Sequence, residues 1–163
     1  MRVVVLADTH LRDAQEKRLT PAAAAEVARA DAILHAGDVT EPRLLEELAA
    51  VAPTHAVLGN NDVALAGRLP ETLVLDLAGV RVGMVHDSGP KTGREGRMRR
   101  LFPDADVVVF GHSHIPWNQP GIDGQLLFNP GSATQRRTQP HRTLGVLDLA
   151  DGRVRRAEIV VVD

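Results

Sequence analysis

The sequence predicts an α/β fold in which two facing β-sheets, forming a β-sandwich, are flanked by helices. Two observations lead to this prediction. In the first part of the chain, short apolar runs alternate with helical patterns, which is typical of βαβ units with parallel strands. In the second part, apolar runs come in pairs separated by short turns, which indicates antiparallel hairpins. The length of 163 residues and the lack of a linker-like segment predict one domain over residues 1–163.

The predicted strands of the first kind are short apolar runs that stop abruptly at polar residues. Runs of this length, rich in β-branched residues, are typical of strands, and several look buried on both faces. They cover residues 3–7, 32–36, 56–58, 80–85 and 107–110.

The helices are predicted from capping signals and spacing. Thr20 and Pro21 open a helix over residues 22–30 as N-cap and first-turn proline, and Glu41-Pro42 opens a second over 43–50. The basic stretch 94–100 is expected to form a short third helix. Two hairpins complete the pattern, one over residues 73–85 and one over residues 143–162, the latter with a turn-forming Asp-Gly pair.

Composition excludes several classes of site. The chain has no cysteine, which rules out disulfides, thiolate metal sites and cysteine nucleophiles. A formal net charge of -2 gives no bulk electrostatic support for a nucleic-acid or membrane partner. No apolar run approaches a membrane span, and the run after Met1-Arg2 is too short for a signal peptide, so we expect a cytoplasmic protein.

The polar residues that end the apolar runs are of types that bind metal. Ligands in parallel sheets gather beyond the carboxyl ends of strands, so we expect these side chains to converge. In an extended backbone, positions i and i+2 point to the same side, so each closely spaced pair could supply two ligands. Glycines before two of the positions permit the unusual backbone angles of a tight turn. The candidate ligands are Asp8, His10, Asp38, Asn60, His86, His112 and His114.

Each cluster taken alone has an ordinary explanation. A histidine at a strand end is usually a polar loop residue, and Gly37-Asp38 by itself is an unspecific turn signal. Repetition of the pattern at the ends of successive runs favours a common site. His35 and His55 lie within or before strands, and we expect them to be hydrogen-bonded structural residues.

Three oxygen ligands and four imidazoles are too many for one tetrahedral ion, but they suit two ions that share a bridging carboxylate. We therefore expect two divalent ions per chain, manganese first, with iron, zinc, nickel and cobalt as alternatives. Two ions about 3.5–4 Å apart can hold a hydroxide near pH ~7 and neutralise phosphate oxygens in the transition state. The substrate that uses both effects best is a small phosphoester.

The order of these motifs resembles the calcineurin-like metallophosphoesterase superfamily. The matching motifs are Asp8-x-His10, Gly37-Asp38, Gly59-Asn60-x-Asp62, His86 and Gly111-His112-x-His114. Asn129-Pro130-Gly131-Ser132 is similar to the small, single-domain prokaryotic phosphodiesterase branch, whose fold resembles the metallophosphoesterase-like subunit of retromer.

The resemblance implies an α/β/β/α sandwich and assigns the ligands. One ion would be held by Asp8, His10, Asp38 and His114. The other would be held by Asp38, Asn60, His86 and His112, so that Asp38 bridges the two ions.

Asn61 and Asp62, which follow a ligand position, are the predicted catalytic residues. Many members of the superfamily carry histidine where this chain has Asn61, and an amide cannot donate a proton as a general acid near neutral pH. Good leaving groups should therefore be favoured over alkyl esters. Relatives usually carry glycine at the position of Asp87, where a carboxylate could repel an anionic substrate or hold a water.

The predicted function is a phosphodiesterase in which a metal-bridging hydroxide attacks phosphorus in line. A phosphomonoesterase is one alternative, and a non-catalytic interaction module with the same fold is another, although all seven expected ligand positions are filled. A protein phosphatase or a nuclease is less favoured by the short chain and its neutral charge. Arg136 and Arg137 are candidates for contacts with substrate phosphate, and Trp117 for an interface in a homo-oligomer.

Overall fold

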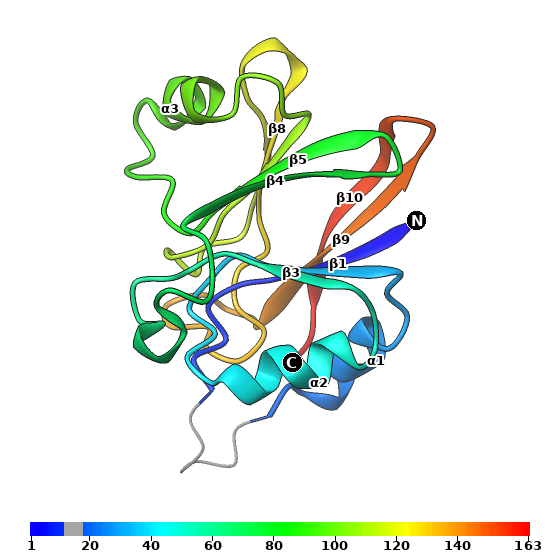
Figure 1. Cartoon of the computed structure of the whole chain (residues 1–163), viewed down its shortest axis with the longest axis vertical. Helices are drawn as coiled ribbons and strands as arrows, with labels where there is room; N and C mark the ends of the chain where they lie inside the picture. The colour runs from blue at the N-terminus through cyan, green and yellow to red at the C-terminus, as the bar shows by residue number, and fades with distance from the viewer. Residues whose placement is uncertain (12–17) are drawn as a thin grey trace.

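The computed structural model, which describes residues 1–11 and 18–163, confirms the predicted two-sheet fold (Figure 1). The strand orders are β10-β9-β1-β2-β3 in the first sheet and β4-β5-β6-β8-β7 in the second. The first sheet consists of β1 (Arg2–Leu6), β2 (Ala32–His35), β3 (Thr54–Ala56), β9 (Thr143–Ala150) and β10 (Arg153–Val161). The second consists of β4 (Thr72–Leu77), β5 (Val80–Val85), β6 (Val107–Val109), β7 (Trp117–Pro120) and β8 (Leu126–Asn129).

Both sheets are mixed, with parallel strands next to antiparallel pairs. Strands β1, β2 and β3 run parallel, as do β5, β6 and β8. The predicted hairpins are β4–β5 and β9–β10. The turns of these hairpins touch, because the Gly152 N–H donates to the carbonyl of Ala78 at 3.0 Å. This contact joins the two sheets at the hairpin tips.

Three helices cover the outer faces of the sheets in the described part of the chain. Helices α1 (Pro21–Val27) and α2 (Pro42–Ala49) lie outside the first sheet, and α3 (Arg94–Leu101) lies outside the second. The Thr20 hydroxyl caps α1 by accepting the N–H of Ala23, as the Thr-Pro signal predicts. Among the described residues, no helix is long and apolar enough to cross a membrane.

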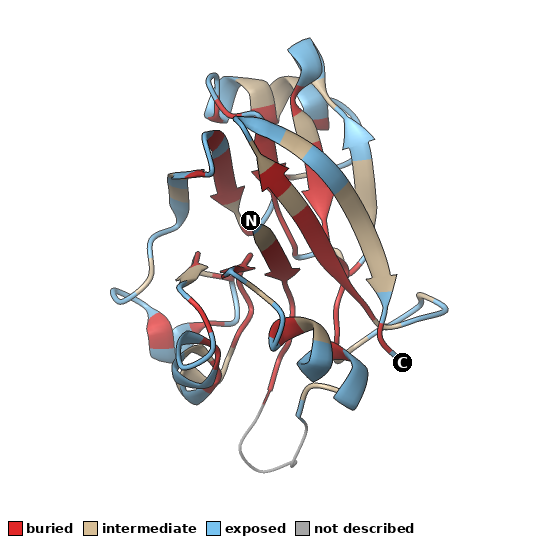
Figure 2. Ribbon diagram, turned by 90° about the vertical axis from the view of Figure 1, so that its right-hand side faces the viewer, coloured by how far each residue is buried: buried red, intermediate tan, exposed pale blue. Residues whose placement is uncertain are grey.

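The layers explain why the first strand is apolar throughout. Val3 and Val5 face the space between the sheets, while Val4 and Leu6 face α1 and α2. All four are fully buried, and Figure 2 shows the central strands as the most buried part of the molecule. The core is largely aliphatic, with three buried phenylalanines, and it lies on both sides of the first sheet.

The main differences from the sequence prediction are in the shortest elements. The strand predicted over residues 56–58 is β3, which ends at Ala56. Leu58 leaves the sheet and donates its N–H to the carbonyl of Pro70 at 2.8 Å. Strands β7 and β8 were not predicted. The first is a polar Trp-Asn-Gln-Pro segment without apolar alternation. Short 3₁₀ helices occur at η2 (Val63–Leu65) and η3 (Ile122–Gly124).

Candidate metal centre

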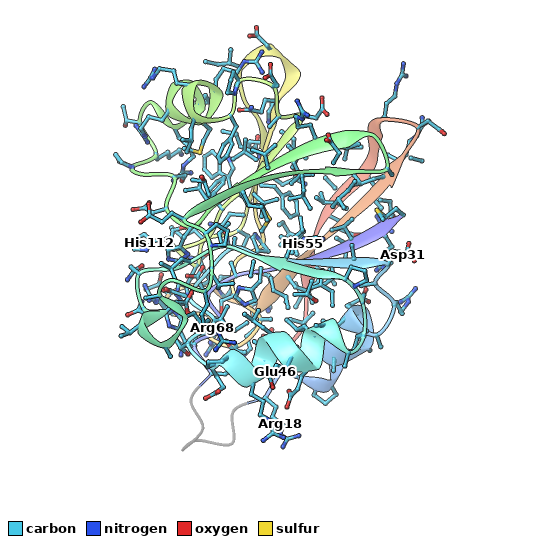
Figure 3. All side chains as sticks on the ribbon, viewed as in Figure 1. Arg18, Asp31, Glu46, His55, Arg68 and His112 are labelled. Atoms are coloured by element: carbon cyan, nitrogen blue, oxygen red, sulfur yellow. The ribbon has the colours of Figure 1, made fainter. Side chains whose placement is uncertain are left out.

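The carboxyl ends of strands from both sheets meet at one edge of the sandwich. Asp8 and His10 follow β1, Asp38 follows β2, and His86 follows β5. His112 and His114 follow β6. In Figure 3, His112 lies on the side of the molecule opposite Asp31, the residue that precedes β2. The predicted convergence at the carboxyl ends therefore brings residues from these four segments together, and Asn60, after β3, adds a fifth.

Two overlapping triads of side chains have the geometry to hold an ion. One is Asp8, His10 and His114, and the other is Asp8, Asp38 and His86. Within each triad, the ligand atoms lie within 4.8 Å of one another, and all five residues are buried. We call these the inner triad and the outer triad. They share Asp8, so a pair of ions bound there would be adjacent.

Asp38, a member of the outer triad, also lies near the inner triad. Its Oδ2 atom is 3.4 Å from Nε2 of His10 and 3.5 Å from Nε2 of His86. In the inner triad, Nε2 of His114 is 3.3 Å from Nε2 of His10 and 3.6 Å from Oδ1 of Asp8. The carboxylate of Asp38 is thus in reach of both ion positions, as a bridging ligand requires.

Backbone carbonyls fix the tautomers of two of the histidines. The Nδ1–H of His114 donates to the carbonyl of Gln135 at 2.8 Å, and that of His86 donates to the carbonyl of Ala36 at 2.7 Å. Because a carbonyl only accepts, Nδ1 must carry a proton, and the Nε2 atom of each ring faces the centre. Histidines that bind metal are commonly oriented in this way by an outer hydrogen bond.

Asn60 joins the outer triad through its side-chain oxygen. Its Oδ1 atom lies 3.0 Å from Nε2 of His86 and 3.0 Å from Nδ1 of His112. Asn60 and His112 are exposed, whereas the inner triad is buried. The centre therefore has a closed inner side and an outer side that is open to solvent.

The residues fit divalent cations. The Oδ2 atom of Asp8 is buried and has no hydrogen-bond partner, and burial raises the pKa of this carboxyl to about 7. Burial also lowers the pKa of His10, and it lowers that of His114 to about 4, so both imidazoles are neutral. Buried neutral imidazoles beside a carboxylate oxygen without a hydrogen-bond partner are the donor set of a metal site.

Asp38 and His86 interact strongly. Burial alone would raise the pKa of Asp38, but hydrogen bonds from His86 and Asn61 hold it below its ordinary value. Burial would lower the pKa of His86, but the Asp38 carboxylate and the carbonyl of Ala36 raise it instead. Asp38 is therefore ionised, and the outer triad favours positive charge at His86.

The backbone is left-handed at five of the seven candidate ligands, and the expectation of an extended backbone at the paired ligands was wrong. The φ angles are 53° at Asp8, 44° at His10 and 56° at Asp38. They are 67° at His112 and 58° at His114. The paired ligands therefore converge because the chain turns sharply at each of them, and such angles strain residues other than glycine.

The glycines before two ligand positions have different roles. Gly37 has a φ of 87°, as a tight strand-to-loop turn requires. Gly59 is needed for space, since a Cβ atom there would lie 2.1 Å from the backbone nitrogen of Asp38. It would also lie 2.3 Å from Oδ1 of Asp38. The absence of a side chain at Gly59 lets the Asp38 and Asn60 loops touch.

Asp62 is buried beneath the centre. Its Oδ2 atom accepts the N–H groups of Asp38 at 2.9 Å and Gly59 at 2.8 Å, and its Oδ1 atom accepts that of Thr40 at 2.7 Å. With three backbone donors on its carboxylate, Asp62 ties the loop that carries Asp38 to the loop that carries Asn60. This placement makes Asp62 a positioning residue.

Asn61 lies against the carboxylate of Asp38. Its backbone N–H donates to Oδ1 of Asp38 at 2.8 Å, and its side-chain amide donates to Oδ2 at 2.7 Å. The residue is exposed, so the amide lies between Asp38 and solvent. Asn61 therefore orients the carboxylate, and its predicted contact with a leaving group stays a prediction.

The two candidate arginines differ in their surroundings. Arg136 donates from Nη1 to the carbonyl of Pro140 at 3.1 Å, within its own loop. Arg137 lies close enough to the inner triad for its charge to lower the pKa values of Asp8, His10 and His114. Only Arg137 is thus placed to act electrostatically at the centre.

The turn after β8 supports the ligand loops, a role that the sequence analysis did not assign. Asn129 donates to the carbonyl of Gly111 at 2.9 Å, next to His112. Ser132 donates from its hydroxyl to the carbonyl of Asp8 at 2.7 Å. The Asn-Pro-Gly-Ser motif was the available signal, but its spacing alone does not show which carbonyls it reaches.

Two arginines of α3 make contacts within the protein, whereas Arg100 on the same helix is exposed. Arg94 is buried, with its guanidinium carbon 5.0 Å from the ring centroids of both Phe110 and Trp117. Arg97 donates to the carbonyls of Ser88, Pro90 and Thr92 and so orders the loop after His86. The prediction that Trp117 anchors self-association stays a prediction.

His35 is a structural residue, as expected. It is fully buried, its Nε2 atom lies 3.1 Å from the Thr9 hydroxyl, and burial lowers its pKa to about 3.

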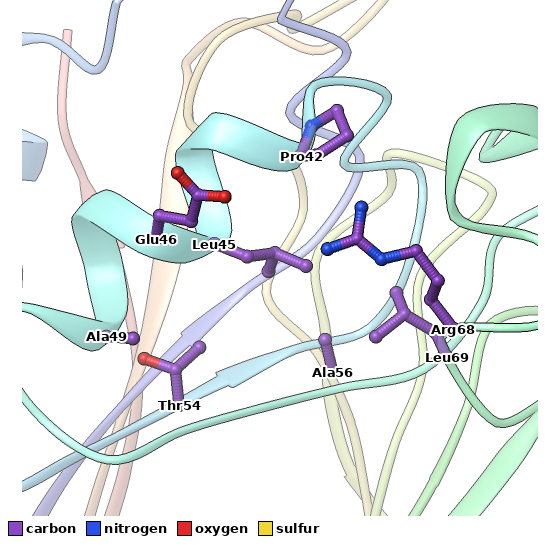
Figure 4. Close-up of a pocket in the computed structure, with 8 residues that line it drawn as sticks. All are labelled: Pro42, Leu45, Glu46, Ala49, Thr54, Ala56, Arg68 and Leu69. Carbon is purple, nitrogen blue, oxygen red and sulfur yellow. The ribbon is translucent and has the colours of Figure 1, made fainter.

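A separate cavity of about 240 Å³ lies between α2 and β3 (Figure 4). Its lining is largely apolar, with Leu45, Ala49 and Leu69 below the charged side chains of Glu46 and Arg68. None of the candidate ligands lines it, so it is distinct from the metal centre.

The sandwich and its cluster of carboxylates and imidazoles define a metal-binding protein of the phosphoesterase class. Residues 1–152 match the calcineurin-like phosphoesterase superfamily domain, and the chain belongs to this superfamily. A relative described as a "Probable metallophosphoesterase" from Methanothermobacter thermautotrophicus is 35% identical over 98% of this chain and 92% of its own length.

Solved structures show the same fold. Vps29 from Chaetomium thermophilum matches with a TM-score of 0.79 and 19% identity, over 98% of this chain and 96% of its own. A structure described as a novel archaeal phosphodiesterase matches with a TM-score of 0.73 and 20% identity, over 98% of this chain and all of its own (100%). These likenesses support the fold.

Proposed function

We propose that the chain is a phosphodiesterase that works with two divalent cations, manganese first among the candidates. The observation that carries the proposal is the position of Asp38, whose Oδ2 atom lies 3.4 Å from His10 of the inner triad and 3.5 Å from His86 of the outer triad. Asp8, His10, Asp38 and His114 would hold one ion. Asp38, Asn60, His86 and His112 would hold the other.

When bound, two such ions lower the pKa of a water to about 7 and neutralise charge that develops on phosphate oxygens. The protein's own residues set the geometry. Asn61 fixes the plane of the Asp38 carboxylate, and Asp62 holds together the two loops that meet there. Arg137 supplies positive charge near the inner triad, which would attract an anionic substrate.

The non-catalytic module is the second candidate, and the likeness to Vps29 favours it. The filled ligand set weighs against it. A scaffold has no need of a buried carboxylate oxygen without a hydrogen-bond partner, such as Oδ2 of Asp8. It also has no need of imidazoles whose Nε2 atoms are turned inward by backbone carbonyls. A phosphodiester is the proposed substrate class, in keeping with the activity named for the archaeal structure.

The test is metal removal followed by reloading. The protein is stripped with a chelator, reloaded with manganese or another single metal, and assayed on bis(p-nitrophenyl) phosphate and p-nitrophenyl phosphate side by side. We expect about two ions per chain and hydrolysis of the diester that disappears on stripping and returns on reloading. A single tight ion would contradict the dinuclear proposal, and full reloading without hydrolysis would favour the non-catalytic module.

Asn61 is expected to restrict the leaving group. Replacing Asn61 by histidine supplies a titratable group, and a positioned acid typically contributes ~10²–10⁴-fold when the leaving group needs a proton. Asn61→His should therefore raise kcat/KM for alkyl phosphodiesters more than for nitrophenyl diesters, whose leaving group needs none. Steady-state kinetics at matched metal content measure the two ratios. Equal changes for both substrates would mean that Asn61 acts through the orientation of Asp38 alone.

A further inference from the structure

Asp87 is a carboxylate on the open side of the metal centre. It follows the ligand His86, and its side chain is 57% exposed. Its Oδ2 atom lies 4.0 Å from Nε2 of His112, whose other ring nitrogen faces Asn60 at 3.0 Å. Among the described residues, Asp87 forms no ion pair with a lysine or an arginine. Asp87 therefore places a negative charge beside the outer ligands, with Arg94 in electrostatic reach but not in contact as an ion pair.

The carboxylate is held in place. Its Oδ1 atom accepts the N–H of Gly89 at 2.7 Å, which closes a turn directly after the ligand His86. The next part of this loop is fixed by Arg97, which donates to the carbonyls of Ser88, Pro90 and Thr92. Because the N–H groups of Arg97 donate to these carbonyls, Arg97 supports the loop and forms no ion pair with Asp87. Oδ1 is thus bound to the backbone, and Oδ2 lies on the side of His112.

We propose that Asp87 is a specificity-determining residue that discriminates by charge against phosphomonoesters and in favour of phosphodiesters. This inference rests on the proposed function. A phosphomonoester carries about two negative charges above its second pKa of ~6, whereas a diester carries one. Repulsion from Asp87 acts on both substrates but is larger for the dianion. In a solvent-exposed site, one extra substrate charge about 4–6 Å from a carboxylate changes binding by ~3–10-fold.

The test uses Asp87→Asn, because asparagine keeps an oxygen for the Gly89 N–H while removing the charge. We expect the ratio of kcat/KM for p-nitrophenyl phosphate to that for bis(p-nitrophenyl) phosphate to rise ~3–10-fold at pH 8. Glu95→Gln, which neutralises an exposed carboxylate on α3, is the control and should leave the ratio unchanged. Metal content is measured in each protein.

A binding measurement separates this inference from the proposed function. Calorimetry at pH 8 on the manganese-loaded proteins compares inorganic phosphate, largely a dianion, with dimethyl phosphate, a monoanion. Asp87→Asn should tighten phosphate ~3–10-fold more than dimethyl phosphate, and 0.5 M salt should shrink that difference. If the parent hydrolyses diesters and neither ratio moves, Asp87 has no such role. If the binding ratio moves but no ester is hydrolysed, the proposed function fails and the charge discrimination stands. Loss of both results would overturn both.

Discussion

Replacing Asp38 by asparagine is expected to reduce diester hydrolysis by ~10³-fold or more, while the protein stays folded. The shape of the side chain is kept, but the negative charge between His10 and His86 is lost. Asparagine also tolerates the φ of 56° at this position, so the backbone should not change. Metal analysis after manganese loading should fall from about two ions per chain towards one, and kcat/KM is measured on the same sample.

Asp104→Asn is the matched control, since it removes an exposed carboxylate in the turn before β6, whereas the ligands His112 and His114 follow that strand. It should leave both metal content and kcat/KM at the parent values. Parental activity in Asp38→Asn would show that Asp38 does not bridge the ions.

Replacing Asp62 by asparagine is expected to destabilise the fold by ~3 kcal/mol, because the side chain accepts three backbone N–H groups. An amide has one acceptor oxygen, so its NH₂ group would face at least one of these donors. Stabilities of whole domains are only ~5–15 kcal/mol, so this loss should be plain in urea denaturation of the metal-free protein. Metal affinity should also fall, by ~10–100-fold, because two ligand loops lose their common support.

Asp31→Asn is the control for this change. Its carboxylate is exposed and accepts one backbone N–H, that of Arg2, at 2.6 Å. We expect a loss below ~1 kcal/mol there. If Asp62→Asn were no more destabilising than Asp31→Asn, the three hydrogen bonds would not be holding the loops together.

The strands and their polar ends could be predicted because each carries a local signal. Val3 to Leu6 is apolar at every position since both faces of β1 are covered, and a run of this kind is readable without a structure. Convergence of Asp8, Asp38 and His86 followed from the general property that parallel strands end at a common edge.

The conformations of the ligands could not be predicted in the same way. An extended Asp-x-His segment also brings alternate side chains to one side, so the spacing of Asp8 and His10 fits two different backbones. The roles of Asp62 and Arg97 depend on which N–H groups and carbonyls come near them. Those contacts join segments that are distant in sequence, such as Asp62 with Asp38, and local sequence patterns do not predict them.

The left-handed turns at the ligands restrict how this centre can change. Aspartate, asparagine and histidine are the side chains other than glycine that adopt positive φ most readily, and they are also good ligands for the metals expected here. Glutamate could serve a metal equally well, but it would be a poor choice for the φ of 53° at Asp8 or 58° at His114. Two independent requirements, a positive φ angle and an atom that binds metal, therefore act on the same positions. In natural or engineered variants of this chain, the ligands at these positions should therefore be exchanged only among Asp, Asn and His, even where a different metal would bind another donor more tightly.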